Sequence, residues 1–158
     1  MTDRLVVPRA VLAAIEDHVV RHLPMESGGI LLGRASGADR VAEEFAPLDS
    51  AAPSERQYLA DAAKCVREVY RAHRASLVIV ATVHSHPAGN TRPSLHDLQS
   101  AFGYDCCWHL IAGFSGDAVT FGVYRYRKER QHLSYSPVML SIPQSEGTLQ
   151  DSYKSTQL

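Results

Sequence analysis

Two histidines, His84 and His86, stand at the end of an uncharged run rich in β-branched residues, 77–83 (LVIVATV). This composition predicts a buried strand. Side chains two positions apart on a strand project to the same face, so the two imidazoles can serve one site. Pro87 ends the strand, and the Gly, Asn and Pro residues within 89–93 predict a loop.

A serine and an aspartate three positions apart follow this loop, where residues 94–102 have a helical pattern. Ser94 and Asp97 would share one face of that helix and point back at the histidines. Two imidazoles and one carboxylate leave the fourth position of a zinc ion for water, as in catalytic zinc sites. Ser94 and Asp97 also form a capping box, which is the commoner explanation when such a pair stands alone. The two interpretations are compatible, because a carboxylate at the start of a helix can also bind a metal.

Residues 84–87 (HSHP) and 94–97 (SLHD) resemble the motif of the JAMM family of zinc metalloproteases, also called MPN-plus or JAB. That family has a glutamate upstream in a Glu-x-Gly-Gly-x-Leu-x-Gly-like stretch, and residues 26–33 of this chain read ESGGILLG. The similarity covers roughly residues 5–127 and holds at every catalytic position. It implies that one Zn²⁺ is held by His84, His86 and Asp97, that Glu26 moves the proton of the attacking water, and that Ser94 stabilises the developing oxyanion.

The resemblance implies an α/β fold, a three-layer-like sandwich of a central mixed β-sheet with flanking helices, similar to the cytidine deaminase core. Deamination is disfavoured, because His86 stands where a deaminase has glutamate and the chain has no Cys-x-x-Cys. The implied reaction is hydrolysis of the amide bond after the C-terminal glycine of a ubiquitin-like or sulfur-carrier protein. One alternative is a non-catalytic MPN scaffold. The other is a DNA-associated protein like the RadC family, whose corresponding loop this chain also resembles at Ala88, Gly89 and Pro93.

Length and composition favour a single domain over residues 1–141, with a polar, flexible tail at 142–158. A formal charge of −1 and a pI near 6.7 give no electrostatic case for nucleic acid as a partner. The chain has no apolar run approaching ~18 residues and no signal-peptide pattern, so no membrane partner is expected. Three cysteines without a framework spacing fit a reducing cytoplasm.

The remaining pattern supplies elements to position the site. We expect an amphipathic helix at 8–22, a hairpin joining 29–33 to 41–48, a helix at 61–74, and strands at 106–112, 118–126 and 133–141. The resemblance implies that loop 49–56 helps to hold the tail of a substrate or covers the site, and the alternative is a plain surface connection. The first helix could dock on a second copy of the chain. Apolar side chains of the 61–74 helix are expected to face the core: Ala62, Cys65, Val66, Val69 and Tyr70.

The other histidines and the adjacent cysteines are not expected to take part in the chemistry. His18 and His22 lie four apart on the first helix but lack the Glu-x-x context of a metal site, so we expect both to face solvent. His109 is expected to be structural or to line the substrate site. Cys106 and Cys107 would point to opposite faces of a strand and share neither a metal nor a disulfide.

Overall fold

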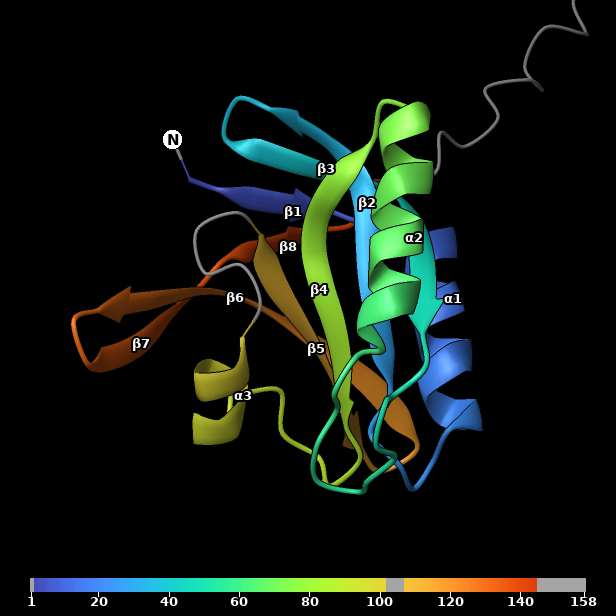
Figure 1. Cartoon of the computed structure of the whole chain (residues 1–158), viewed down its shortest axis with the longest axis vertical. Coiled ribbons are helices and arrows are strands. Elements are labelled where there is room, and N and C mark those ends of the chain that lie inside the picture. Colours follow the sequence, from blue (N-terminus) through green and yellow to red (C-terminus); the bar gives the residue numbers. More distant parts are fainter. Residues whose placement is uncertain (1, 102–106, 145–158) are drawn as a thin grey trace, which may run out of the picture.

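The computed structural model describes residues 2–101 and 107–144 of the chain (Figure 1). Their strands form one sheet in the order β7-β6-β5-β4-β2-β3-β1-β8. In chain order the elements are β1 (Arg4–Val6), α1 (Arg9–Arg21), β2 (Gly28–Ser36), β3 (Asp39–Leu48), α2 (Ala62–Arg74), β4 (Val78–His86), α3 (Leu95–Ser100), β5 (Trp108–Ser115), β6 (Ala118–Glu129), β7 (His132–Pro137) and β8 (Met139–Ser141).

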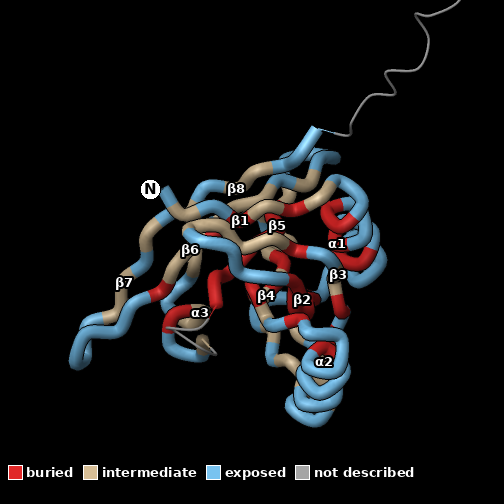
Figure 2. Tube along the Cα trace, turned by 90° about the horizontal axis from the view of Figure 1, so that it is seen from above, coloured by how far each residue is buried: buried red, intermediate tan, exposed pale blue. Residues whose placement is uncertain are grey.

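The sheet is mixed and has helices on both faces, as predicted. β2 runs antiparallel to β3 and β4, β4 and β5 are parallel, and β5, β6 and β7 are antiparallel. Helix α1 lies on one side of the sheet and α2 on the other (Figure 2). The fold is therefore a layered α/β sandwich, and the hairpin expected from residues 29–48 is present as β2 and β3.

The strand predicted at 133–141 is wrong as a single element. β7 pairs with β6 at one edge of the sheet, whereas β8 pairs in parallel with β1 at the other edge. Only Val138 separates them, and its N–H donates to the carbonyl of Val123 at 2.8 Å. The sheet curls enough for one continuous segment to reach both edges, and an ion pair between Asp3 and Arg125 joins the two edge regions.

Helix α1 covers the larger of the two hydrophobic clusters. Its stripe of Val11, Leu12, Ile15 and Val19 lies closest to β3 and β2 and shares one cluster with buried residues of β1 to β6. His18 belongs to this buried stripe, because it lies three positions after Ile15, so the expectation that it faces solvent is wrong. The same expectation is confirmed for the exposed His22.

Helix α2 covers the smaller cluster, which contains Ile30, Leu32 and Leu48, and its predicted buried face is largely wrong. Ala62, Val66, Val69 and Tyr70 are all exposed, Cys65 is half-buried, and Ala72 is the buried residue of the helix. Most of α2 is accordingly pale blue in Figure 2.

The orientation of α2 has a physical cause. Cys65 and Ala72, seven positions apart, are small enough to let the helix approach the sheet. Lys64 and Arg71 make ion pairs with Asp49 and Glu44 at the margin of that contact. These contacts turn the stripe of larger apolar residues outwards.

None of the helices in the described part of the chain is long and apolar enough to cross a membrane. The strand expected from residue 106 is observed from Trp108, and Cys106 lies outside the described residues. The same holds for most of the predicted tail, from residue 145 onwards.

Candidate metal centre and active site

The two histidines lie at the C-terminal end of β4, on the sheet face that α2 covers. In the antiparallel ladder with β2, His84 is opposite Gly28 and Thr82 is opposite Ile30. Ile30 packs in the α2-side cluster, and residues paired across strands share a face, so His84 and His86 project to the α2 side. A side chain at position 28 would lie 2.0 Å from the carbonyl oxygen of Val83, so glycine is required for β2 to approach β4 here.

Asp97 is held by the start of α3. The Asp97 N–H donates to the Ser94 Oγ at 3.0 Å, and the Ser94 N–H donates to the Asp97 Oδ2 at 2.8 Å. This reciprocal pair is a capping box, and it fixes the carboxylate while leaving it directed at the histidines. The structure thus contains both the helix cap and the cluster that the sequence suggested.

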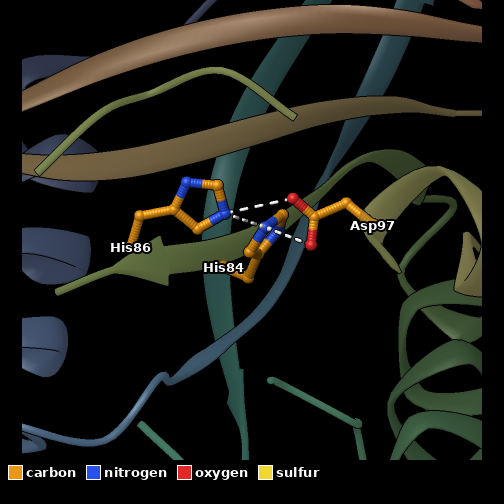
Figure 3. Close-up of side chains that lie close together, drawn as sticks. All are labelled: His84, His86 and Asp97. Carbon is orange, nitrogen blue, oxygen red and sulfur yellow. Dashed lines mark hydrogen bonds and ion pairs between the residues drawn. The ribbon is translucent and has the colours of Figure 1, made fainter. Parts of the chain in front are cut away.

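The three side chains bring their ligand atoms together, as Figure 3 shows. The Nε2 atoms of His84 and His86 are 3.1 Å apart. The Asp97 Oδ1 lies 3.3 Å from the His84 Nε2, and the Asp97 Oδ2 lies 3.1 Å from the His86 Nε2. Ligands about 2.0–2.1 Å from a tetrahedral zinc ion are about 3.3–3.4 Å from one another. The observed separations therefore fit a zinc ion.

The tautomer of His86 also fits a cation. Its Nδ1 lies 2.8 Å from the carbonyl oxygen of Asn90, which can only accept, so the Nδ1 carries the proton. In a neutral imidazole the lone pair of Nε2 then faces the carboxylate of Asp97 and the Nε2 of His84. A cluster of electron pairs aimed at one point requires a positive charge among them, and a backbone carbonyl that orients a ligand histidine is usual at zinc sites.

The pKa values of Asp97 and His86 are shifted by burial and by the contacts within the cluster. Burial disfavours the charged form of Asp97, but hydrogen bonds with His84 and His86 outweigh it and hold the pKa of this carboxyl far below its usual range. Burial likewise disfavours the charged form of His86, yet in that form its Nε2 donates a hydrogen bond to the Asp97 Oδ2, so the pKa of this imidazole is raised overall. The site therefore keeps its carboxylate ionised and attracts positive charge.

Glu26 lies two residues before Gly28, where β2 begins to pair with β4. The Ser85 N–H donates to the carbonyl of Ser27 at 2.8 Å, and the Ser27 N–H donates to the Ser85 Oγ at 2.9 Å. Continuing the pairing of Gly28 with His84 by two residues places Glu26 opposite His86. Burial raises the pKa of Glu26 to about 7, while the charge of His86 partly offsets this rise. The residue is only 8% exposed.

Ser94 still has its hydroxyl proton available after capping. Its oxygen accepts from the Asp97 N–H, and that bond does not use the hydroxyl proton. The side chain is at the exposed start of α3, next to the aspartate of the cluster. Its hydroxyl can therefore donate to a group bound at the site.

Three supporting groups were not predicted from the sequence. The carbonyl of Asn90 orients His86, the buried hydroxyl of Ser85 ties β4 to Ser27, and the carbonyl of Ser54 accepts from the Glu26 N–H at 2.8 Å. The last contact places loop 49–56 against the residue that carries the buried carboxylate. Two of these groups are backbone carbonyls, which leave no signature in side-chain type.

His109 does not join the cluster. Its Nδ1 lies 2.7 Å from the Thr82 Oγ1, and its ring stacks on Tyr126 at 3.8 Å between centroids. Burial lowers the pKa of His109 to about 3, so the ring is neutral at ordinary pH. These contacts fit the structural role, which is one of the two roles expected for His109.

Comparison with known proteins places the chain in a family. A model of the prokaryotic homologues of the JAB domain matches residues 8–124, and the chain belongs to this family. It is similar to a probable TtuB-protein conjugate cleaving protease of Thermus thermophilus, with 35% identity over 98 residues, which are 61% of this chain and 63% of that protein. The chain thus spans less than two thirds of the length of this relative.

A solved structure supports the fold independently of the site. The solution structure of a protein from Desulfitobacterium hafniense superposes with a TM-score of 0.74 over 88% of this chain and 94% of the other, at 23% identity. At this identity the likeness concerns the fold alone.

Proposed function

We propose that this chain is a zinc-dependent isopeptidase or peptidase that hydrolyses the amide bond after the C-terminal glycine of a ubiquitin-like or sulfur-carrier protein. The observation that carries the proposal is the convergence of His84, His86 and Asp97 near the buried carboxylate of Glu26. Membership of the JAB family and the similarity to a protein named as a TtuB-protein conjugate cleaving protease support this class of reaction.

Three clustered side chains supply the donor atoms that a metal ion would need. His84, His86 and Asp97 would bind one zinc ion and leave a position open, as catalytic zinc sites do. When bound, zinc supplies a Lewis acid that polarises the scissile carbonyl and lowers the pKa of water from about 15.7 towards about 7. Asn90 keeps the His86 Nε2 directed into the site through its hydrogen bond with Nδ1.

Glu26 is the proposed general base and acid. Amide hydrolysis needs one group to accept a proton from the attacking water and to deliver it to the departing amine nitrogen. A carboxyl whose pKa is raised to about 7 by burial can do both near neutral pH. Ser94 would donate its free hydroxyl proton to the developing oxyanion and so stabilise the transition state. No serine or cysteine nucleophile is required.

A defined conjugate tests the proposal. TtuB joined through its C-terminal carboxyl to the ε-amine of a lysine in a reporter peptide is incubated with the zinc-loaded chain, and the products are identified by intact mass. We expect TtuB with a free carboxyl and the peptide with a free amine, a gain of one water across the two products. Glu26→Gln, loaded with the same amount of zinc, should release neither product.

The opposite result is equally informative. If the wild-type chain binds one equivalent of zinc but cleaves neither this conjugate nor a linear fusion after the same residue, the proposed reaction is wrong. If the purified chain binds no zinc at all, the scaffold alternative replaces the enzyme.

A further inference from the structure

The loop 87–93, which joins β4 to α3, lies over two glycines of the sheet. Gly113 on β5 pairs with His86 on β4, and Gly122 on β6 pairs with Ile111 on β5, which in turn pairs with His84. Residues paired across strands share a face, so both glycines lie on the face that carries the two histidines. We call Gly113 and Gly122 the glycine notch.

The loop occupies the space that side chains at these two positions would take. A Cβ added to Gly113 would lie 2.5 Å from the carbonyl oxygen of Gly89 and 2.9 Å from the Cγ2 of Thr91. A Cβ added to Gly122 would lie 3.1 Å from the Thr91 Oγ1 and 2.7 Å from the Tyr124 hydroxyl. The side chain of Thr91 therefore lies over both strands, and glycine is required at position 113 for the loop backbone to approach β5.

The same loop carries the carbonyl group that orients His86. Asn90 stands between Gly89 and Thr91, the two residues that contact the notch, and its carbonyl oxygen lies 2.8 Å from the His86 Nδ1. The carbonyl carbon of Asn90 would itself be 3.1 Å from a Cβ at Gly113. The position of this carbonyl group therefore depends on how closely the loop approaches β5.

Two hydrogen bonds shape the loop without fixing its position over the sheet. The Gly89 N–H donates to the carbonyl of His86 at 3.1 Å, and the Arg92 N–H donates to the Asn90 Oδ1 at 3.0 Å. Both bonds join residues within the segment 86–92, so they can persist while the loop moves relative to β5. Contact with the glycine notch, in contrast, ties the loop to β5 and β6.

We propose that Gly113 and Gly122 are positioning residues of the metal centre. By admitting Thr91 they hold the Asn90 carbonyl on the His86 Nδ1, and this hydrogen bond keeps the His86 Nε2 directed at the metal. The inference rests on the zinc binding of the proposed function. Loss of a group that orients a metal-binding histidine typically lowers metal affinity by about 10- to 100-fold.

A single methyl group is large enough to disturb this arrangement. Non-bonded heavy atoms pack at about 3.5 Å, so a Cβ at Gly113 would push the Gly89 carbonyl and the loop backbone away by roughly 1 Å. A movement of that size would take the Asn90 oxygen, now 2.8 Å from the His86 Nδ1, beyond the range of a hydrogen bond.

Gly113→Ala in the full chain tests the proposal. We expect zinc affinity, measured by competition with a chelator, to fall about 10-fold or more. In the zinc-loaded variant the His86 Nδ1 proton, followed by heteronuclear NMR, should exchange with solvent faster than in the wild type, because it has lost its acceptor. Wild-type zinc affinity together with wild-type exchange of this proton would overturn the proposal.

Gly33→Ala is the matched control. Gly33 is a buried glycine of β2, and a Cβ there would lie 1.9 Å from the carbonyl oxygen of Val41, so this substitution also strains the sheet. Gly33 pairs with Val78, at the other end of β4 from His86. The variant should lose stability without any change in zinc affinity or in exchange of the His86 Nδ1 proton. An equal loss of zinc affinity in Gly33→Ala and Gly113→Ala would overturn the proposal, because it would show a general effect of lost stability.

Thr91→Ala decides the question if Gly113→Ala does not fold, because it empties the notch without adding an atom. We expect zinc affinity to fall about 10-fold, with faster exchange of the His86 Nδ1 proton. Thr91→Val keeps both branches of the side chain and should retain the wild-type values. Wild-type values for Thr91→Ala, or an equal loss in Thr91→Ala and Thr91→Val, would overturn the proposal, because the fit to the notch would then not be what matters.

Failure of the proposed function has a different signature. In that case the wild-type chain binds no zinc, and the position of the loop is judged in the metal-free chain. A nuclear Overhauser contact between the Thr91 methyl group and the α protons of Gly113, lost in Gly113→Ala, would support placement of the Asn90 carbonyl by the notch. Absence of this contact in the wild type, or its persistence in Gly113→Ala, would overturn it.

Discussion

Two pairs of histidines in this chain have similar sequence signals and different structural outcomes. His84 and His86 are two apart on a strand, and their Nε2 atoms are 3.1 Å from each other and within 3.3 Å of one carboxylate. His18 and His22 are four apart on a helix, and their rings lie 4.2 Å apart between centroids at a tilt of 38°. Within the described residues, only the first pair belongs to a cluster of three ligand atoms.

The two pairs differ in which carbonyl group accepts a hydrogen bond from the Nδ1 atom of the second histidine, His86 or His22. The carbonyl of Asn90, outside β4, accepts from the His86 Nδ1 and leaves Nε2 free to face the site. The carbonyl of His18 accepts from the Nδ1 of His22 one turn away, at 2.7 Å, and His18 itself is buried edge-on against Phe45. A histidine pair can form a metal site where another element supplies a third ligand and the backbone orients the rings.

The largest expected effect is the loss of metal on changing Asp97. Asp97→Asn keeps an oxygen that can accept from the Ser94 N–H, so the cap survives, but it removes the negative charge of the third ligand. We expect zinc affinity to fall by more than about 100-fold. Zinc content after purification and competition with a chelator measure this directly.

The other histidine pair provides the control for this experiment. His22→Gln alters a ring of the helical pair and should leave one zinc per chain with wild-type affinity. Zinc retained at full affinity by Asp97→Asn, or lost from His22→Gln, would reverse the distinction between the pairs.

The next effect concerns turnover without metal loss. Glu26→Gln preserves the size of the side chain and the N–H bond to Ser54 but removes the proton acceptor. We expect kcat to fall by roughly 10²–10⁴-fold with zinc content unchanged. The measurement is single-turnover cleavage of the TtuB conjugate by enzyme with a verified zinc content. Near-normal cleavage would exclude Glu26 as the base.

The sequence was sufficient to predict the cluster of His84, His86 and Asp97 because its spacing is local. His84 and His86 alternate on one strand, and Asp97 follows after a single loop, so the strand period and a helix start determine their placement. The position of Glu26 relies on non-local pairing of β2 with β4, and only the family resemblance indicated it. The orienting carbonyl of Asn90 could not be foreseen, because every residue has a carbonyl.

The two errors in the predicted fold, the buried face of α2 and the single strand at 133–141, also arise from contacts that are not local in the sequence. Periodicity in residues 61–74 showed which apolar residues share a face of α2, but it cannot show whether a sheet covers that face. The direction was decided by Cys65 and Ala72 approaching the sheet and by the ion pair of Arg71 with Glu44 on β3. Likewise, the three-residue β8 is defined by its parallel pairing with β1, at the opposite end of the chain.

A smaller effect concerns the pH dependence of the free energy of unfolding. Glu26 and His18 should change it in opposite directions. Burial raises the pKa of Glu26 from 4.5 to about 7 in the folded, metal-free chain. The folded state therefore binds this proton more tightly than the unfolded state, and the resulting stability is present below pH 4.5 and lost as pH rises through 7. This change corresponds to about 3 kcal/mol.

Glu26→Gln should therefore make the metal-free chain more stable than wild type at about pH 8 by up to about 3 kcal/mol, with little difference at about pH 4.5. Burial has the opposite consequence at His18, whose pKa it lowers, so that contribution is present above pH 6.5 and lost as pH falls. Urea denaturation of metal-free wild type and Glu26→Gln at both pH values measures the effect. An equal stability difference at the two pH values would show that the carboxyl is not the titrating group.

The smallest effect compares one helix-end hydrogen bond at each site. Ser94→Ala removes the acceptor for the Asp97 N–H and should lower the free energy of unfolding by about 1 kcal/mol. His22→Ala removes a donor to the His18 carbonyl and should lower the free energy of unfolding by about 1 kcal/mol or less.

The two variants should nevertheless differ in turnover, because only Ser94 has a hydroxyl proton beside the cluster of His84, His86 and Asp97. We expect kcat to fall about 10-fold or more for Ser94→Ala, to recover in Ser94→Thr, and to stay at the wild-type value for His22→Ala. If both alanine variants lose stability alike and neither loses turnover, Ser94 serves only as a cap, and oxyanion stabilisation must come from another group.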